Sequence, residues 1–389
     1  MRTAKKATDV YAYVLRGIET GKFRIGDRIP SERDLAIQFS VSRPTITAAI
    51  QRLVGENLIR RSRNAGSVVL KAPPRKSLTF GAILLGLSRQ HEEETIFSAV
   101  GNEILHRASM EHSMVLLQDP SWLEYPRDPG LTQRYTAIIS QFIERKVAGV
   151  FLTPQWILPE QYVSMTGGVV EELAQAAIPV VLIDGDLVRY PARSRFDLVG
   201  IDNFHSGYIL TEHFLKLGCR KIDFFAIAMR HPTQEARIAG YLKAMEVHGL
   251  RPDPASIHYG NLLGGDFVVA TLRRRHPEAV LVVNDFRAAA LMRMALAAGI
   301  KVPQEVRIGG FDDLPMSSHL SVPLTTIRQP AAGIGAIALH TMLQRINEPQ
   351  LPPMHVELSA ELIVRASSGS PIVHARTLRQ SAWTSRNCW

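Results

Sequence analysis

The sequence predicts an α/β protein in two parts: a small N-terminal α+β domain and a larger domain of parallel sheets flanked by helices. Three observations lead to this prediction. A helical hairpin followed by two short strands occupies the first 70 residues, and strands and helices alternate from Leu78 onward. The net positive charge of the chain lies before Leu78. At 389 residues, the chain is long enough for two or three domains.

The stretch from Pro30 to Leu53 predicts two short helices joined by a tight turn. The first begins at Ser31, a capping residue followed three positions later by Asp34. The second begins at Ser42, and Pro44 lies in its first turn, where a missing N–H costs nothing. Its apolar residues fall on one stripe at helical spacing: Ile46, Ala49, Ile50 and Leu53. This pattern indicates a helix-turn-helix, whose second helix enters the major groove of DNA.

The flanking segments favour this interpretation over a helical hairpin in an unrelated small domain. An amphipathic helix is expected over Tyr11–Phe23, ending at Gly21, a good C-cap. Two strands over Leu58–Arg61 and Ser67–Leu70 surround a turn at Asn64–Gly66. Together these elements form a winged helix. The start of its second helix is expected to expose side chains that bond to phosphates or base edges: Ser42, Arg43, Thr45 and Thr47.

Residues 8–70 resemble the DNA-binding domain of the GntR family. The matching pieces are GKFRIGDRIPSERDLAIQFSVSRPTI, the A-x-x-x-L after it, and the wing. The resemblance implies DNA contacts by Arg33, Arg43, Thr45 and Gly66. With the other exposed residues, the expected DNA-binding set is Arg33, Ser42, Arg43, Pro44, Thr45, Thr47 and Gly66. The chain departs from the family at Thr47, where arginine is usual, and in its wing sequence Asn-Ala-Gly-Ser.

The charge of the chain is divided unevenly between its two parts. Residues 1–76 contain 16 Lys and Arg against 6 Asp and Glu, a net charge of +10, whereas the whole chain carries +9. The remainder therefore carries a net charge of −1. A basic excess that coincides with the helix-turn-helix is expected for neutralising DNA phosphates and releasing their counterions. A merely solvated basic surface would not explain this coincidence.

Two segments are expected to lack regular structure. Residues 71–77 contain two prolines among basic residues, which predicts an extended, semi-rigid linker after a DNA-binding domain at 1–70. Residues 371–389 contain three arginines and no acidic residue. They predict a disordered basic tail over 369–389, with an operator-contacting tail as the alternative.

Residues 78–368 predict the larger, two-lobed domain. Short apolar runs such as Val180–Ile183 and Val280–Val283 lack polar alternation, which is typical of parallel strands covered by helices on both faces. About 290 residues are too many for one sheet core, so we expect two lobes. The chain is expected to cross between the lobes near residues 202, 327 and 351 and to form a hinge there.

Polar side chains follow several of these strands. They are Asp184 after VVLI, Asn284 and Asp285 after VLVV, and Asp312 and Asp313 after RIGGF, while Arg237 follows HPTQEA. A single Asp after a strand is commonly a helix cap, but ligands of open α/β sheets bind at the carboxyl ends of the strands. Several such groups together indicate one polar ligand, and carboxylate, amide and guanidinium suit hydroxyl groups. Phe267 is expected to cover the apolar face of a ring.

Residues 78–368 also resemble the effector-binding domain of the LacI/GalR family, which is similar to periplasmic sugar-binding proteins. The matching stretches are IPVVLIDGD, VGIDNFHSGYILTEHFLKLGCRKI, ARIAGYLKAMEVHGL, LVVNDFRAAAL, AAGIKVPQEVRIGGFDD and PLTTIRQPAAGIGAIAL. The resemblance implies a periplasmic-binding-protein-like fold and effector contacts by Asp184, Arg237, Phe267, Asn284, Asp312 and Thr153. It implies a structural role for Asp285, and Leu85 is apolar where the family has a polar residue. A winged helix in front of such a domain resembles the arabinose-repressor type of regulator.

The sequence shows no signature of catalysis or of a cofactor. It lacks a GxGxxG after a strand, a P-loop, GxSxG and HExxH, and its 13 histidines show no ligand spacing. We therefore expect no enzyme activity, no metal and no cofactor. Two cysteines, Cys219 and Cys388, fit a reducing cytoplasm, and we expect neither a membrane span nor a signal peptide.

Together these features predict a ligand-responsive transcriptional regulator in the cytoplasm. We expect a repressor that leaves its operator when a small polar effector such as a sugar binds, and a homodimer on two-fold-symmetric DNA. Three alternatives stay open at this point. They are a co-repressor-dependent regulator that binds a nucleobase-like ligand, a transport-type sugar-binding protein, and an enzyme with an accessory DNA-binding domain.

Overall fold

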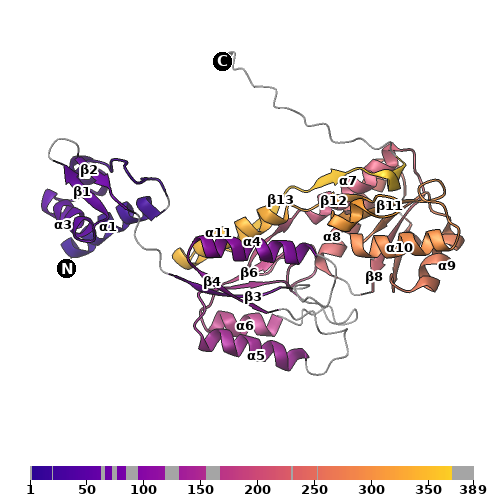
Figure 1. Ribbon diagram of the computed structural model, residues 1–389, viewed down its shortest axis with the longest axis horizontal. Coiled ribbons are helices and arrows are strands. Elements are labelled where there is room, and N and C mark those ends of the chain that lie inside the picture. Colours follow the sequence, from indigo (N-terminus) through magenta and orange to yellow (C-terminus); the bar gives the residue numbers. More distant parts are fainter. Residues whose placement is uncertain are drawn as a thin grey trace, which may run out of the picture. The chain divides into compact units, whose positions relative to one another are not determined.

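The computed structural model consists of two compact units, Met1–Ser77 and Leu78–Trp389 (Figure 1). It describes residues 2–19, 21–62, 66–71, 77–84, 95–118, 131–154, 167–228, 231–251 and 253–369. Four features expected from the sequence lie wholly or mostly outside these ranges: residues 64 and 65 of the hairpin turn, most of the linker, Leu85, and the tail beyond residue 369.

The described residues of the first unit form three helices and then a two-stranded antiparallel sheet. The elements are α1 (Arg2–Glu19), α2 (Glu32–Phe39), α3 (Arg43–Gly55), β1 (Ile59–Ser62) and β2 (Gly66–Val69). The first helix begins at Arg2, so its expected start at Tyr11 was wrong, whereas its expected end at Gly21 agrees with the structure. Gly21 has a positive φ of 76°, which takes the chain out of the helix, and the ring of Phe23 turns back onto Gly17.

Capping and an apolar core explain the two central helices. The Oγ of Ser31 accepts a hydrogen bond from the backbone N of Asp34 at 3.2 Å and so caps α2. Pro44 lies in the first turn of α3. The stripe expected on α3 is buried and joins one core with α1, α2 and the sheet: Val10, Val14, Ile18, Leu35, Ile46, Ala49, Ile50, Leu53, Ile59 and Val69. This core holds the start of α3 in a fixed orientation.

The second unit contains two six-stranded sheets. The first has the order β13-β7-β6-β5-β3-β4 and only parallel pairs: β3 (Thr79–Ile83), β4 (Met114–Gln118), β5 (Val150–Leu152), β6 (Val180–Ile183), β7 (Asp197–Ile201) and β13 (His355–Leu358). The second has the order β14-β12-β11-β10-β8-β9: β8 (Ile222–Ile227), β9 (Ile257–Gly260), β10 (Ala279–Val282), β11 (Arg307–Asp312), β12 (Thr325–Arg328) and β14 (Glu361–Ile363). It is parallel except for β14, which runs antiparallel to β12 at the edge.

Helices cover both faces of the first sheet and make the first lobe (Figure 1). One face carries α4 (Ile96–Met110) and α11 (Ala331–Asn347), and the other carries α5 (Leu131–Glu144) and α6 (Gly167–Gln175). Two separate apolar clusters result, because a strand covered on both sides sends alternate side chains into different layers.

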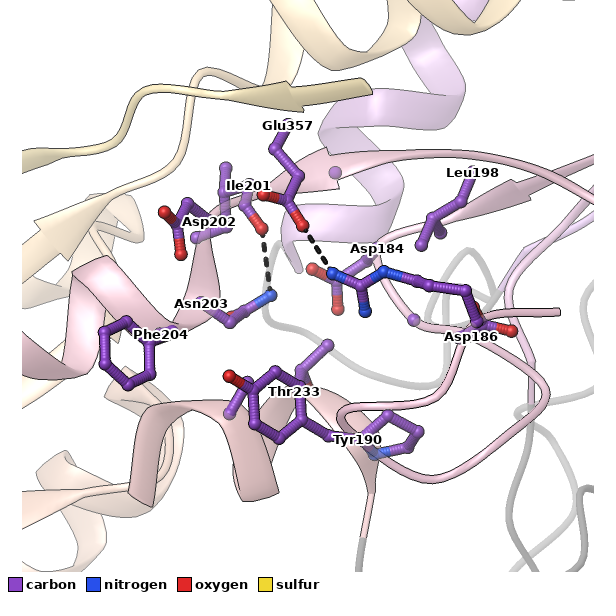
Figure 2. A pocket seen from close by; sticks show the side chains of 15 residues that line it. Asp184, Asp186, Tyr190, Leu198, Ile201, Asp202, Asn203, Phe204, Thr233 and Glu357 are labelled. Atoms are coloured by element: carbon purple, nitrogen blue, oxygen red, sulfur yellow. Dashed lines mark hydrogen bonds and ion pairs between the residues drawn. The ribbon is translucent and has the colours of Figure 1, made fainter. Parts of the chain in front are cut away.

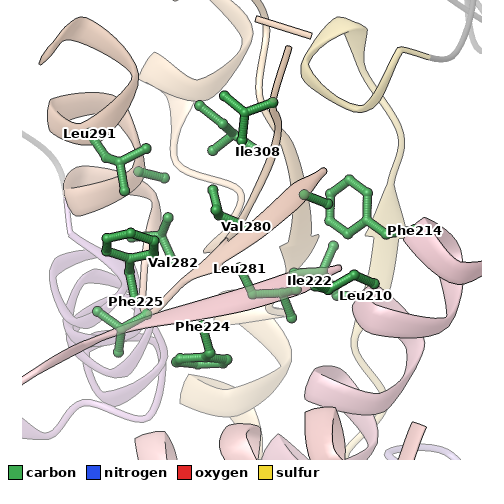
Figure 3. Packing of buried hydrophobic residues seen from close by; sticks show 14 of the residues in the cluster. Leu210, Phe214, Ile222, Phe224, Phe225, Val280, Leu281, Val282, Leu291 and Ile308 are labelled. Carbon is green, nitrogen blue, oxygen red and sulfur yellow. The ribbon is translucent and has the colours of Figure 1, made fainter. Parts of the chain in front are cut away.

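The second lobe has the same layered plan. Its described helices are α7 (Asn203–Lys216), α8 (Pro232–Val247), α9 (Gly265–Arg275) and α10 (Asp285–Ala297), with short 3₁₀ turns at Pro254–Ser256, Pro315–Ser318 and Ala366–Ser368. Figure 3 shows Leu210 and Phe214 of α7 on one side of the strands and Leu291 of α10 on the other. The carboxyl ends of β8, β10 and β11 are thereby held at one edge of the lobe.

The chain passes between the two sheets at three described places. They lie between β7 and α7, between β12 and α11, and between β13 and β14. The third crossing is therefore at residues 358–361, and the expectation of a crossing near 351 was wrong. Residues 349–354 stay with the first lobe because Asp197 of β7 holds them: its Oδ1 accepts from the backbone N of Met354 and from Arg345, each at 2.8 Å.

The predicted fold class is confirmed. Two parallel-sheet lobes flanked by helices follow an N-terminal helix-turn-helix domain. Within the described ranges, every helix is too short or too polar to cross a bilayer.

Candidate functional site

The start of α3 and one residue of α2 present basic and polar side chains to solvent. Arg33 of α2 and Ser42, Arg43 and Pro44 at the start of α3 are exposed. Within the described part of the chain, neither Arg33 nor Arg43 has an ion-pair partner. Two free guanidinium groups beside a helix N-terminus form a surface that suits DNA phosphates and base edges.

Thr45 does not belong to this exposed surface, so the expectation for its side chain was wrong. Only 4% of Thr45 is exposed, and its Oγ1 lies 2.9 Å from the Oγ of Ser42. Thr45 lies one helical turn before Ala49 and belongs to the buried face of α3. This face is therefore wider than the apolar stripe seen in the sequence. A DNA contact by Thr45 would require this hydrogen bond to be exchanged.

The hydroxyl of Thr47 is directed to α2. Its Oγ1 donates to Oε2 of Glu32 at 3.3 Å, and the other carboxylate oxygen of Glu32 pairs with Arg61 of β1. Glu32 thus ties α2, α3 and the wing strand together, a role that the sequence did not indicate. Gly66, the first residue of β2, is exposed with a φ of 76°, a backbone conformation that favours glycine.

The expected effector residues of the second unit lie mostly at the carboxyl ends of strands. We call Thr153, Asp184, Arg237, Asn284 and Asp312 the interlobe site. Thr153 and Asp184 follow β5 and β6 of the first lobe, whereas Asn284 follows β10 and Asp312 ends β11 of the second. Arg237 reaches the same region from the first part of α8.

Arg237 is the centre of the site in the second lobe. It is 4% exposed; its Nε donates to Oδ1 of Asn203 at 2.8 Å and its Nη1 to the carbonyl oxygen of Val283 at 2.7 Å. Nη2 lies 3.9 Å from Oδ1 of Asp312, beyond hydrogen-bond distance. The guanidinium carbon sits 4.6 Å from the centre of the Phe311 ring. These contacts fix the cation to two strand ends and to the first crossing between the lobes.

Close contact between α7 and α8 sets the position of Arg237. A Cβ atom added at Gly207 would overlap the carbonyl oxygen of Arg237, and one added at Gly240 would overlap that of Phe204. The two helix backbones therefore touch, which no larger residue at these two positions allows. No local sequence signal indicates this contact, because neither glycine lies in a turn.

Next to Arg237, Asp312 and Gln329 form a buried hydrogen-bonded pair. Nε2 of Gln329 donates to Oδ1 of Asp312 at 2.7 Å. Burial raises the pKa of Asp312 to about 7; the charges of Asp285 and Asp184 act in the same direction and Arg237 opposes them. Asp312 also has a φ of 119°, which is unusual for a residue with a side chain and often marks functional sites.

Asp184 faces the second lobe. It has a φ of 67°, and its buried Oδ1 has no hydrogen-bond partner among the residues that the structure describes. The imidazole of His231, which caps α8, lies against Gly185, where a Cβ atom would collide with it. Burial lowers the pKa of His231, so this ring is neutral at physiological pH. His231 belongs to the irregular stretch before Arg237, where no sequence motif marks it as functional.

Two pockets lie next to these residues, and they divide the interlobe site. A pocket of about 250 Å³ is bordered by Asp184, and Figure 2 shows Asp184, Asn203 and Glu357 pointing toward it from three elements. A second pocket, of about 200 Å³, is bordered by Asp312, Gln329 and the start of α4. Each has walls from both lobes. Arg237 lies buried and borders neither of them.

The remaining expected residues, Thr153, Asn284 and Phe267, border neither of these two pockets. Thr153 is 1% exposed, and its Oγ1 has no hydrogen-bond partner within the described ranges. Asn284 caps α10, because its Oδ1 accepts from the backbone N of Arg287 at 3.1 Å. Phe267 packs edge-on against Phe225 with the ring centres 6.4 Å apart, and it borders neither pocket. The structure therefore does not bring Phe267 together with the rest.

The carboxylate of Asp285 is used inside the second lobe. It accepts from Ser317 and Thr326 hydroxyls at 2.6 Å each and from the backbone N of Leu314 at 3.1 Å. It is fully buried, and burial raises its pKa to about 6. Nothing of this carboxylate remains for a ligand. Among the described residues, no cluster of His, Cys, Asp or Glu is arranged to hold a metal ion.

Two family models match the chain. One, described as a periplasmic binding protein-like domain, matches residues 211–368, and another, described as bacterial regulatory proteins of the gntR family, matches residues 6–69. The first includes Arg237, Asn284 and Asp312, and the second includes the whole of α2 and α3.

Individual proteins align over much of the chain. DegA, an HTH-type transcriptional regulator of Bacillus subtilis (strain 168), is 30% identical over 248 residues, or 63% of this chain and 70% of DegA. An arabinose metabolism transcriptional repressor of Geobacillus stearothermophilus is 24% identical over 383 residues, or 94% of this chain and 98% of the other. The structure of the transcriptional regulator CelR in complex with cellobiose has a TM-score of 0.62 at 20% identity, covering 87% of this chain and 100% of that one.

Proposed function

The chain belongs to the LacI/GalR-type helix-turn-helix transcriptional regulators, with a GntR-family DNA-binding domain, and on this basis we propose that it is a repressor controlled by a small polar effector. Residues 1–70 bind the operator, and residues 78–368 bind the effector. The observation that carries the proposal is the position of Arg237: a buried cation in the interlobe site bonded to Asn203 at a crossing between the lobes.

Operator binding uses the start of α3 together with Arg33 and the wing. Exposed Ser42 and Arg43 enter the major groove, and Arg33 contacts the backbone beside it. Thr45 and Thr47 contribute mainly by orienting this surface, because their hydroxyls bond to Ser42 and Glu32. The basic excess of residues 1–76 supports the electrostatic part of binding.

The effector we propose is a sugar or a related polyol. The interlobe site combines carboxylates, an amide and a guanidinium between two lobes, which suits several hydroxyl groups at once. The related CelR structure was solved with cellobiose, and one relative is an arabinose metabolism repressor. A regulatory rather than a catalytic role follows from this family membership.

Effector binding closes the lobes and changes the operator affinity. A homodimer held by the effector domains places two winged helices on a two-fold-symmetric operator. The effector shifts this equilibrium only by the difference between its affinities for the two states. A tenfold loss of operator affinity requires a difference of about 1.4 kcal/mol.

A gel-shift titration with the DNA upstream of the protein's own gene tests this function. We expect a retarded complex that disappears when the correct sugar is added, and the same complex with Arg237→Ala but without the sugar response. A ligand that strengthens the complex would instead indicate a co-repressor. Absence of any complex with operator fragments selected from random DNA would contradict the proposal.

A further inference from the structure

We propose that Arg61 of the wing strand β1 binds a DNA phosphate beside the exposed start of α3, where Thr47 leaves the helix without a cation. This inference rests on the proposed function and adds a DNA-binding residue that lies outside the helix-turn-helix. It follows from the contacts of one side chain, Glu32, at the start of α2.

Glu32 brings Arg61 to the recognition helix. One carboxylate oxygen of Glu32, Oε1, accepts from Nη2 of Arg61, and the other, Oε2, accepts from Oγ1 of Thr47 at 3.3 Å. A single carboxylate group therefore separates the guanidinium of Arg61 from the first turns of α3. Arg61 follows Glu32 by 29 positions, so no helix-turn-helix pattern marks it.

Arg61 keeps most of its donors for a ligand. Within the described ranges, its one hydrogen-bond partner is Glu32, which occupies Nη2. An arginine has five N–H donors, so the others remain for solvent or a ligand. The side chain is 43% exposed. A guanidinium that is held at one nitrogen and exposed at the others suits the bidentate binding of phosphate oxygens.

Two further arginines lie around the same carboxylate. Arg33 follows Glu32 directly in α2. Arg43 lies four residues before Thr47, so both point to the same side of α3. The side chains of Arg33 and Arg43 are exposed and have no ion-pair partner in the described part of the chain. Arg61 therefore joins the surface that already carries the two arginines expected to contact DNA.

The acidic residues of these helices do not cancel this positive charge. Glu32 compensates one of the three arginines. The other carboxylate of α2, Asp34, accepts from the hydroxyl of Ser31 at 2.7 Å, and α3 contains no acidic residue. Three arginines against two carboxylates leave an excess of one positive charge. Phosphate groups complement such an excess, and the release of their counterions favours binding.

The position of Arg61 also accounts for the departure at Thr47. Arginine is usual there in the GntR family, whereas the threonine of this chain is too short to carry a charge away from α3. Glu32 bonds to both side chains, so Arg61 places a guanidinium beside the same helical turn from the wing. The two positions are thus alternative origins of one cation, and an arginine at position 47 should replace Arg61.

The salt dependence of DNA binding by the full-length chain tests this assignment. The probe is a mixed-sequence duplex of about 30 base pairs, or about three helical turns, so no operator sequence has to be known. Fluorescence anisotropy gives the affinity between about 50 and 200 mM salt. Arg61→Gln keeps an amide that can bond to Glu32 and loses the charge. We expect it to weaken binding several-fold and to reduce the slope of log affinity against log salt by about 0.9, the value for one phosphate contact.

Arg60→Gln is the matched control. Arg60 precedes Arg61 in β1, is exposed, and pairs with Val68 of β2. Successive side chains of a strand point to opposite faces, so Arg60 faces away from Glu32. The substitution removes the same charge from the same strand, and its slope change should be less than about half of that in Arg61→Gln.

Thr47→Arg supplies the test of replacement. In the Arg61→Gln protein it should restore the slope and most of the affinity, whereas Thr47→Gln, which is long but neutral, should restore neither. In the unchanged protein Thr47→Arg should gain less, because Arg61 already occupies the position and the two effects are not additive. Urea unfolding of each variant shows whether it is as stable as the unchanged protein.

The outcomes separate this inference from the proposed function. An unchanged slope in Arg61→Gln, equal slope changes in Arg61→Gln and Arg60→Gln, or an equal gain from Thr47→Arg in both backgrounds overturns the inference and leaves DNA binding intact. If the unchanged protein binds neither this duplex nor the DNA upstream of its own gene, the proposed function is refuted, and the role of Arg61 with it.

Discussion

The Nε atom of Arg237 lies 2.8 Å from Oδ1 of Asn203. Arg237 belongs to the interlobe site, whereas Asn203 is the first residue of α7, directly after the chain leaves the first sheet. The bond therefore joins a buried cation of the site to a segment that connects the lobes. A ligand that moves the guanidinium would shift this connecting segment directly through the hydrogen bond.

Replacing Asn203 by alanine should destabilise the effector domain. The buried Nε of Arg237 would lose its acceptor, and a missing partner of a buried charged group costs about 1–3 kcal/mol. The free energy of unfolding from urea titration measures this loss. Asn347→Ala, at an exposed position at the end of α11, is the control and should change it by less than about 0.5 kcal/mol. Equal effects of both variants would contradict the role of the bond.

Gly240→Ala should destabilise the second lobe by overpacking. The new Cβ would overlap the carbonyl oxygen of Phe204, so α7 and α8 would have to separate, at a cost of about 1–3 kcal/mol. Because α8 carries Arg237, effector affinity should fall in the same variant. Gly168→Ala in α6, where nothing lies within 4 Å of the new atom, is the matched control. The two glycines are compared by urea unfolding, and a stable Gly240→Ala protein would disprove the close contact.

Arg43→Ala should weaken operator binding by about 1–3 kcal/mol, because an exposed guanidinium at the start of α3 would be lost. Arg52→Ala tests the same helix at its other end, where the guanidinium is bonded to Glu56 at 3.1 Å, and should leave the affinity nearly unchanged. Gel-shift titrations at one salt concentration give both values. Unchanged affinity for Arg43→Ala would exclude its contact with DNA.

Asp312 should make stability depend on pH. Its pKa rises from 3.8 to about 7 on folding, chiefly by burial, so the folded state binds the proton more tightly than the unfolded state does. The free energy of unfolding should therefore fall as the pH rises from about 4 to about 7 and then level off. Asp312→Asn removes this contribution, whereas Asp285, with a pKa of about 6, keeps a smaller slope in both proteins. The urea midpoint should fall less steeply with rising pH in Asp312→Asn than in the unchanged protein. Equal slopes in the two proteins would show that Asp312 does not titrate in this range.

The strand ends of the interlobe site could be predicted because the runs before them are continuous and apolar. VVLI before Asp184 and RIGGF before Asp312 predict buried parallel strands, and the polar residue that follows marks the carboxyl end. The partners could not be predicted in this way. Asn203 meets Arg237 across 34 positions of sequence through the contact of two helices, which no local pattern records.

Local patterns also misled where a tertiary contact decides the outcome. The position of Thr45 at the start of the second helix predicts an exposed side chain, but α3 turns this side toward the core, where the hydroxyl bonds to Ser42. A crossing is expected near residue 351, but Asp197 and Arg345 hold that segment against the first lobe. In the first case burial against the domain core decides the outcome, and in the second a partner far away in the sequence does.

The last crossing restricts how the lobes can move. β13 ends at Leu358 in one sheet and β14 begins at Glu361 in the other, so three peptide steps, about 10 Å at full extension, tether the two sheets. A tether this short limits how far the two sheets can slide past each other and favours rotation about its own position. Displacement in a rotation grows with the distance from the pivot, so the surfaces of the effector domain farthest from Leu358 travel the most when the lobes close. The edge strands β13 and β14 are therefore the pivot of such a rotation.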